Sequence, residues 1–222
     1  MENGRAGYCL EGMILKEILA LGAESLIFKI NKWNLPLILK WRQTKPYLFK
    51  DIDSQLNRAR TNRECKMLSI ARMLGVPTPA VYSVDLTNHT ILMDYIEGTQ
   101  FKQLTETLSS NKLVSLCQKF GHLIALLHRG DVVHGDPTTS NLIVDRRSFL
   151  WMIDFGLSEM NATVEMKGVD LHLIRRALET THWELEEIML EATLDGYVDT
   201  MGENANNVIS RMTEIRERGR YH

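Results

Sequence analysis

Three polar residues around a short predicted hairpin most constrain how this chain can fold. Asp136 is followed five positions later by Asn141, and Asp154 opens the tripeptide Asp154-Phe155-Gly156. The apolar runs 141–144 and 149–153 are joined by a polar turn, a pattern typical of two paired strands. Such a hairpin places Asn141 and Asp154 side by side, with Asp136 in the loop that leads into it.

The same residues have the spacing of a phosphoryl-transfer site of the protein-kinase type. In such a site a carboxylate, here Asp136, orients the attacking oxygen. An amide oxygen and a second carboxylate, here Asn141 and Asp154, hold the magnesium ions that neutralise the phosphates of ATP. The sequence therefore predicts an ATP- and Mg²⁺-dependent phosphotransferase with Asp136 as its catalytic base.

A site of this type also needs a lysine and a glutamate upstream, and both are present. Residues 37–40 are typical of an apolar strand that ends in the lysine that binds the nucleotide's phosphates, here Lys40. Helical spacing predicts a helix over about 55–74, with Glu64 just beside its stripe. Lys40 and Glu64 are predicted to form a catalytic ion pair; a solvated Glu64 paired with Arg60 is the alternative. The residues near the stripe are Leu56, Ala59, Arg63, Met67, Ile70, Ala71 and Leu74.

The loop expected to cover the phosphates departs from the glycine-rich pattern of protein kinases. Only Gly22 remains between the predicted strands 14–20 and 25–30, and Glu24 and Ile27 stand where further glycines would be. Because side chains restrict this backbone and a carboxylate repels triphosphate, we expect a stiffer lid and slow turnover. A hinge whose backbone would bind adenine is predicted at 93–98. The residues predicted to contact the nucleotide are Leu21, Gly22, Ala23, Glu24, Ser25, Lys29, Lys40, Met93, Asp94 and Tyr95.

The order of predicted elements fits one small kinase unit. The chain has 222 residues, 44% of them hydrophobic, which is enough to bury a core in one or two lobes. We expect an α+β, minimal bilobal protein-kinase-like fold. It would have an antiparallel-sheet N-lobe at 1–97, a truncated, mainly helical C-lobe at 98–215, and a basic C-terminal tail at 216–222.

Missing features narrow the kind of kinase. Gly135 stands where protein kinases carry an arginine, and Thr138 stands where they carry a lysine. Only about a dozen residues separate Gly156 from the helix predicted to start near Val169, and no Ala-Pro-Glu motif follows. A segment that docks a peptide substrate does not fit in this space.

Charge is unevenly distributed although the net charge is only −2. Residues 40–72 contain nine basic and three acidic side chains, and the C-terminal region adds Arg211, Arg216, Arg218 and Arg220. A basic edge of this kind can dock RNA, although a solvated helix face explains it equally well. The three cysteines lack metal-ligand spacing and no apolar run has transmembrane length, so a cytoplasmic protein with reduced thiols is expected.

Taken together, the motifs of this chain resemble those of the small atypical kinase of the KEOPS (EKC) complex, which works in making threonylcarbamoyladenosine in transfer RNA. The most specific shared segments are 138–141 and 218–220, while Pro137 and Ser25 depart from the family's usual residues. The shared segments are Gly22–Ser25, Lys40 with Arg42 and Lys45, Asp53, Arg60–Glu64, Gly75–Pro79, Met93–Gly98, His134–Asn141, Asp154–Gly156, Val169–Leu171, Thr180–His182 and Arg218–Arg220.

The resemblance implies an archaeal-type subunit that hydrolyses ATP and can phosphorylate serine or threonine. It implies two protein partners: the threonylcarbamoyl-transferring synthase at the C-lobe and a small regulatory subunit at the N-lobe. It further implies that Arg218 and Arg220 contact transfer RNA or the synthase, alongside the basic helix.

Two other functions remain open. Small-molecule kinases of the aminoglycoside or choline type also use His-Gly-Asp with an asparagine five positions on, but they need a long helical C-terminal region. A pseudokinase scaffold usually lacks a metal ligand or the lysine, whereas here all five catalytic positions are filled.

Overall fold

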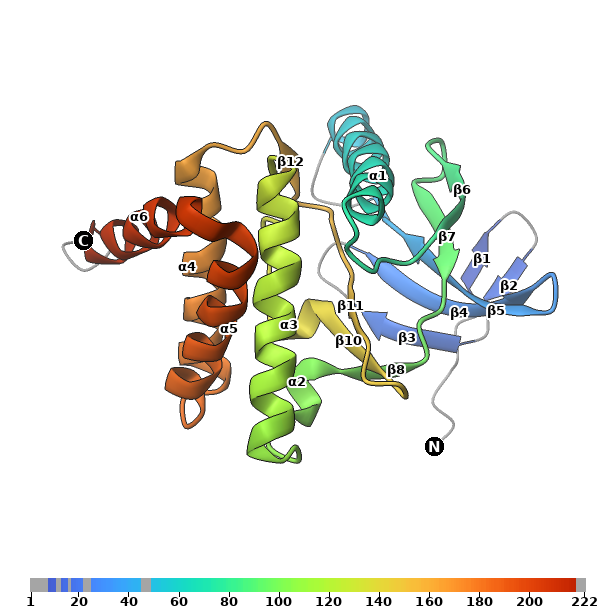
Figure 1. Cartoon of the computed structure of the whole chain (residues 1–222). Helices are drawn as coiled ribbons and strands as arrows, with labels where there is room; N and C mark the ends of the chain where they lie inside the picture. The colour runs from blue at the N-terminus through green and yellow to red at the C-terminus, as the bar shows by residue number, and fades with distance from the viewer. Residues whose placement is uncertain (1–7, 11–12, 16, 22–24, 45–48, 219–222) are drawn as a thin grey trace. The chain divides into compact units, whose positions relative to one another are not determined.

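The computed structural model describes residues 8–10, 13–15, 17–21, 25–44 and 49–218 (Figure 1). The chain divides into two compact units. Unit 1 comprises residues 1–65 and 79–95, and unit 2 comprises 66–78 and 96–222. Unit 1 carries an antiparallel sheet and unit 2 is mainly helical, so the predicted α+β class is confirmed.

Unit 1 is built on a five-stranded antiparallel sheet in the order β3-β4-β5-β7-β6. A separate hairpin joins β1 to β2, so the strand predicted at 14–20 corresponds to two strands, β2 and β3. Trp33 and Asn34 turn β4 into β5 with φ of 54° and 59°, the left-handed backbone that tight hairpins require. The strands are β1 Tyr8–Leu10, β2 Met13–Leu15, β3 Glu17–Leu21, β4 Leu26–Lys32, β5 Leu35–Trp41, β6 Val81–Asp85 and β7 Thr90–Asp94.

The sheet's apolar core is formed by alternate residues of its central strands. Leu26 and Phe28 of β4 pack with Leu37 and Leu39 of β5 and with Leu92 of β7. Successive side chains of a strand point to opposite faces, so this alternation gathers one apolar face. The register places Lys40 opposite Ile27 on β4 and Ile91 on β7, in the middle of the sheet.

Helix α1, Lys50–Met73, begins five residues before the predicted start, and its buried face agrees with the predicted stripe only at Met67 and Ala71. Leu56, Ala59 and Arg63 of the predicted stripe are exposed. The buried positions are Asp53, Asn57, Thr61, Glu64, Met67, Leu68 and Ala71. The first half of this face consists of the polar residues Asp53, Asn57, Thr61 and Glu64, so the spacing of apolar residues could not reveal it.

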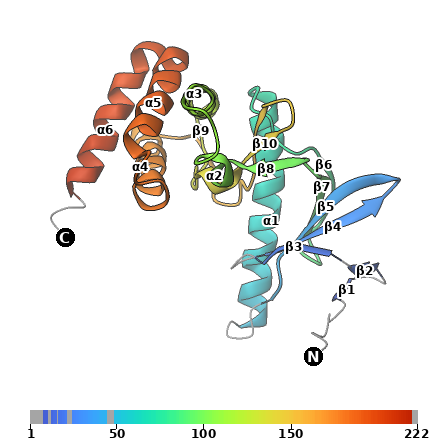
Figure 2. The ribbon, with the colours of Figure 1, turned by 90° about the horizontal axis from the view of Figure 1, so that it is seen from below.

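Unit 2 is dominated by helices, with α3 and α5 running side by side (Figures 1 and 2). A Cβ added at Gly121 of α3 would lie 1.8 Å from the carbonyl oxygen of Thr193. A Cβ at Gly196 of α5 would lie 2.0 Å from that of Gln118, so glycine at both positions allows the two backbones to touch. The helices are α2 Phe101–Leu104, α3 Ser110–Arg129, α4 Val164–Thr181, α5 Glu186–Met201 and α6 Ala205–Arg218.

Short strands of unit 2 frame its loops. Strands β8, β10 and β11 form one antiparallel sheet, and β9 pairs with β12. The predicted hairpin is confirmed, since Leu142 of β10 pairs with Met152 of β11. These strands are β8 Gly98–Gln100, β9 Val132–Val133, β10 Leu142–Asp145, β11 Leu150–Met152 and β12 Glu159–Met160, and single 3₁₀ turns cover Thr139–Asn141 and Gly202–Asn204.

Two helix boundaries differ from those predicted. Helix α4 begins at Val164 rather than near Val169, because the hydroxyl of Thr163 caps it by accepting a hydrogen bond from Met166 N. Helix α6 continues to Arg218, so Arg216 and Arg218 are helical rather than part of a tail. Within the described residues, no helix combines the length and the apolar character needed to cross a membrane.

Candidate active site

Lys40 and Glu64 form an ion pair inside unit 1, as the sequence predicts. The Nζ of Lys40 lies 2.7 Å from Oε1 of Glu64, and the two side chains are 4% and 1% exposed. The other carboxylate oxygen, Oε2, accepts a hydrogen bond of 2.5 Å from Nη2 of Arg42. One carboxylate therefore meets two buried cations, and the group of three carries one net positive charge.

Arg42 is the residue of this group to which the sequence assigned no role. It lies two positions after Lys40, directly after the end of β5, and both side chains contact Glu64. Its Nε and Nη1 are buried and have no partner among the described residues. Removal of Lys40 alone would leave Glu64 paired with Arg42, so the carboxylate keeps a counter-charge.

The residues predicted to contact the nucleotide are placed only in part. Gly22, Ala23 and Glu24 lie outside the described residues; Leu21 ends β3 and Ser25 precedes β4. Lys29 of β4 sets its ammonium 4.0 Å from the ring centre of Tyr95. Met93 and Asp94 end β7, where Asp94 Oδ2 accepts a hydrogen bond from Ala80 N and Oδ1 accepts one from the Tyr82 hydroxyl. Both carboxylate oxygens of Asp94 are thus used to hold the start of β6 by hydrogen bonds.

Asp136 and Asn141 are in direct contact in unit 2. The amide Nδ2 of Asn141 donates to Oδ2 of Asp136 at 2.8 Å and to its backbone oxygen at 2.9 Å. Ile153 N donates to the carbonyl oxygen of Asn141 at 2.9 Å, which extends the β10–β11 pairing by one step. Asp154 follows at once, so the hairpin brings Asn141 and Asp154 to the same end, as predicted.

The donor set at this end of the hairpin fits a hard cation. Because Nδ2 of Asn141 is directed at Asp136, its amide oxygen is the atom left for a metal ion. Asp154 is exposed and adopts a left-handed backbone with φ of 63°. Magnesium is usually held by one or two protein oxygens together with substrate phosphates and waters, which is the number of ligands available here. No cluster of three or more His, Cys, Asp or Glu side chains that could hold a metal occurs among the described residues.

Asp170 of α4 is a site residue whose role the sequence analysis missed. Its carboxylate accepts hydrogen bonds from His134 N at 2.7 Å and Gly135 N at 2.9 Å, the two residues before Asp136. It also lies 3.3 Å from Nε2 of His128. The available signal was a carboxylate on an apolar helix face, because Asp170 is buried on the same face of α4 as Leu171 and Ile174.

The histidines around this carboxylate are buried in the neutral form. Burial lowers the pKa of His128, although Asp170 acts in the opposite direction. With Nε2–H directed at Asp170, its Nδ1 accepts a hydrogen bond from the Tyr197 hydroxyl at 2.9 Å. Burial likewise lowers the pKa of His134. Its Nδ1 accepts from Asp136 N, its Nε2 donates to Ile153 O, and its ring centre lies 4.6 Å from that of Phe155.

The predicted contacts at the C-terminus are placed in part. Arg218, in the last turn of α6, lies 3.5 Å from Glu165 and 3.4 Å from Glu214. Its guanidinium is therefore engaged within unit 2. Arg220 lies outside the described residues.

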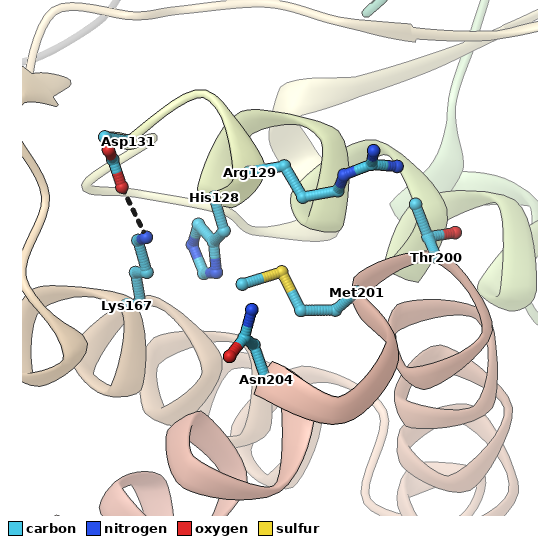
Figure 3. A pocket seen from close by; sticks show the side chains of 7 residues that line it. All are labelled: His128, Arg129, Asp131, Lys167, Thr200, Met201 and Asn204. Atoms are coloured by element: carbon cyan, nitrogen blue, oxygen red, sulfur yellow. Dashed lines mark hydrogen bonds and ion pairs between the residues drawn. The ribbon is translucent and has the colours of Figure 1, made fainter.

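A separate polar cavity of about 520 Å³ lies at the ends of α3 and α5 (Figure 3). Lys167 spans its edge by an ion pair of 2.7 Å to Asp131. None of the catalytic residues predicted from the sequence lines it. The lining residues are His128, Arg129, Asp131, Lys167, Thr200, Met201 and Asn204.

Comparison with known proteins identifies the family. A family model described as the RIO domain matches residues 28–168, more than half of the chain. The chain is 39% identical over 212 residues to the KEOPS complex subunit Bud32 of Pyrococcus abyssi, covering 92% of this chain and 96% of that relative. The chain belongs to the Bud32 family of RIO-domain proteins. The resemblance inferred from the motifs is thus confirmed.

Two further relatives show how widely this family region occurs. The EKC/KEOPS complex subunit bud32 of Dictyostelium discoideum is 31% identical over 209 residues, covering 91% of this chain and 82% of that relative. A probable bifunctional tRNA threonylcarbamoyladenosine biosynthesis protein of Methanobrevibacter smithii is 38% identical over 204 residues. There the match covers 92% of this chain but only 36% of the relative, so the Bud32 region is about a third of that longer protein.

Proposed function

We propose that this chain is the ATP-dependent kinase and ATPase subunit of a KEOPS complex and supports the formation of threonylcarbamoyladenosine in transfer RNA. Its reaction is the Mg²⁺-dependent transfer of the γ-phosphoryl group of ATP to water or to a serine or threonine hydroxyl. The names of its Bud32 relatives support the assignment to this complex and to tRNA modification.

The contact between Asn141 and Asp136 carries the chemical part of the proposal. The amide nitrogen orients the Asp136 carboxylate, while the amide oxygen and Asp154 lie at one end of the hairpin and would serve as oxygen ligands. A base and a cation site that share one side chain suit a reaction in which an oxygen attacks a metal-bound phosphate.

Each residue has a distinct role in the proposed reaction. Lys40, held by Glu64, binds the α- and β-phosphates. Asn141 and Asp154 hold Mg²⁺, which neutralises charge on the phosphates when bound. Asp136 orients the attacking oxygen and takes its proton as the bond from the γ-phosphorus to the ADP oxygen breaks. A general base of this kind contributes roughly 10²- to 10⁴-fold to the rate.

The partners follow from the family. We propose that unit 2 binds the threonylcarbamoyl-transferring synthase and that unit 1 binds a small regulatory subunit. Arg58, Arg63 and Lys66 on the exposed side of α1, together with Arg218 and Arg220, would contact transfer RNA through its phosphates. Such contacts would weaken steeply with salt.

The test is ATP hydrolysis by the chain alone and with the synthase and transfer RNA added. We expect stimulation by these partners and a loss of at least roughly 100-fold in Asp136→Asn and Lys40→Ala. Asp199→Asn, an exposed carboxylate on α5, is the matched control and should retain wild-type turnover. Wild-type turnover by Asp136→Asn, measured after circular dichroism shows that it is folded, would refute the assignment.

A further inference from the structure

His182 connects the loop that carries Asp136 to a distant turn of unit 2. It follows α4 directly as its C-cap and is 6% exposed. Its Nε2 lies 2.9 Å from the hydroxyl of Thr139, in the 3₁₀ turn between Asp136 and Asn141. Its Nδ1 lies 3.2 Å from the hydroxyl of Thr105, which follows α2. One buried ring therefore joins three segments of the chain.

The surrounding hydrogen bonds determine which ring nitrogen carries the proton. The Thr105 hydroxyl donates its only hydrogen to Lys102 O at 3.2 Å, so it must accept from Nδ1–H of His182. The Nε2 atom is then bare and accepts the hydroxyl hydrogen of Thr139. Burial, followed by the charge of Lys102, lowers the pKa of His182, which favours this neutral ring.

The turn that follows Asp136 is bound to His182 through the hydroxyl of Thr139. Thr138 N donates to Asp136 O at 2.9 Å, and Asn141 N donates to Thr138 O at 3.0 Å. The backbone from Asp136 to Asn141 is therefore held by local hydrogen bonds that both involve Thr138, and Thr139 is the next residue of this turn. Asp170 fixes the two residues before Asp136, and His182 fixes the residues after it, so α4 and its cap hold the loop on both sides.

We propose that His182 is a positioning residue for phosphoryl transfer: through the Thr139 hydroxyl it fixes the turn that aims Asp136 and the metal ligand Asn141. This inference rests on the proposed function, since it assigns a role within that reaction. The hydrogen bonds of the imidazole within the described residues go to Thr139 and Thr105, so its effect on Asp136 and Asn141 would pass through the Thr139 hydroxyl.

Isosteric substitutions separate positioning from stability. Thr139→Val and His182→Phe remove the hydrogen bond and retain the shape. Thr193→Val is the control, because this equally buried hydroxyl of unit 2 donates to Met189 O in α5, away from the loop. We expect Thr139→Val and His182→Phe to lower kcat for ATP hydrolysis roughly 10- to 100-fold with little change in KM for ATP, because catalytic groups are misaligned by a fraction of an ångström.

The positioning role predicts the results for three further variants. Thr139→Ser, which retains the hydroxyl, should restore most of kcat. The double variant His182→Phe/Thr139→Val should be no slower than the worse single variant, because both remove one interaction. Thr193→Val should lose comparable stability in urea unfolding but keep wild-type kcat. A kcat of Thr139→Val and His182→Phe equal to that of Thr193→Val would overturn the proposal.

A second measurement tests the geometry without activity. The ring ¹⁵N shifts of His182 should report an Nδ1-protonated neutral ring in the wild type, and Thr139→Val should change the Nε2 shift most. An Nε2 shift in Thr139→Val equal to that of the wild type would overturn the proposal, because it would mean that His182 does not bond to the Thr139 hydroxyl. Lys40→Ala and Asp136→Asn are assayed in parallel to separate the two proposals. If these two variants retain full ATP turnover, the proposed function is refuted. If they lose turnover while the His182 variant keeps wild-type kcat, only the positioning role is refuted.

Discussion

The Lys40 group of unit 1 and the Asp136 loop of unit 2 are held in place by different kinds of interaction. In unit 1, the Glu64 carboxylate is shared by the two buried cations of Lys40 and Arg42. In unit 2, the Asp170 carboxylate meets two backbone N–H groups and a neutral imidazole. The first arrangement holds its side chains by attraction between opposite charges, and the second holds the backbone by hydrogen bonds.

The difference matches what each part is proposed to bind. The three side chains Lys40, Arg42 and Glu64 together carry one formal positive charge, which suits an anionic phosphate. The loop of unit 2 presents Asp136 and Asp154, which suit a cation. Neutral hydrogen bonds can hold that loop without altering its charge, whereas the lysine must be held by an opposite charge because it is buried.

The largest effect is expected from Glu64→Ala. This change leaves Lys40 and Arg42 buried without their shared counter-charge, so unfolding free energy should fall by about 3–5 kcal/mol. Urea unfolding provides the measurement, with Glu191→Ala on the exposed side of α5 as the control. A loss below about 1 kcal/mol would show that the Lys40 group is not held by charge balance.

Asp170→Ala should be the next most damaging substitution. It leaves His134 N, Gly135 N and the His128 ring without their acceptor, and each unsatisfied buried donor costs about 1–3 kcal/mol. Some relaxation is expected, so the total should be roughly 3 kcal/mol, accompanied by loss of ATP turnover. Asp199→Ala serves as the control in the same urea experiment. Full turnover by Asp170→Ala would show that the loop keeps its shape without this carboxylate.

The same contrast explains which parts of the site the sequence could predict. Lys40, Asp136, Asn141 and Asp154 match the motif of a phosphoryl-transfer site, and two apolar runs joined by a polar turn predicted the hairpin between the last two. Asp170 and His182 were missed as functional residues because their partners lie far along the chain and leave no local pattern. The polar face of α1 was missed for the same reason: Glu64 is buried by its cations, which helical periodicity cannot show.

Gly196→Ala tests how closely α3 and α5 pack against each other. Glycine to alanine in a helix normally stabilises by about 1 kcal/mol. Here the new Cβ would lie 2.0 Å from Gln118 O, so we expect a loss of about 1–3 kcal/mol instead. Asp195→Ala, on the exposed side of the same turn, is the control in thermal unfolding. A stabilised Gly196→Ala would contradict the close approach of α3 and α5.

Acid should weaken unit 2 through its neutral histidines. Burial lowers the pKa of His128, His134 and His182 in the folded state, so below their ordinary pKa of 6.5 the unfolded chain binds more protons than the folded one. The free energy of unfolding should therefore fall as pH drops below 6.5, by up to about 1.4 kcal/mol per pH unit for each histidine.

The matched variant for this pH dependence is His128→Gln, since glutamine can still donate to Asp170 and accept from Tyr197 without titrating. Its unfolding free energy, measured in urea from pH 7.5 to 5.0, should fall less steeply than that of the wild type. Equal slopes would mean that folding does not lower the pKa of His128.

The smallest effect is expected at an ion pair with the same length as the one in unit 1. Arg146 and Glu97 lie 2.7 Å apart, as Lys40 and Glu64 do, but their side chains are 80% and 63% exposed. Water and salt screen such a pair, so a double-mutant cycle with Arg146→Ala and Glu97→Ala should give a coupling of about 0–1 kcal/mol that disappears at 1 M salt. A coupling above about 2 kcal/mol would mean that distance rather than burial sets the strength of these pairs, and the large loss expected for Glu64→Ala would then need another cause.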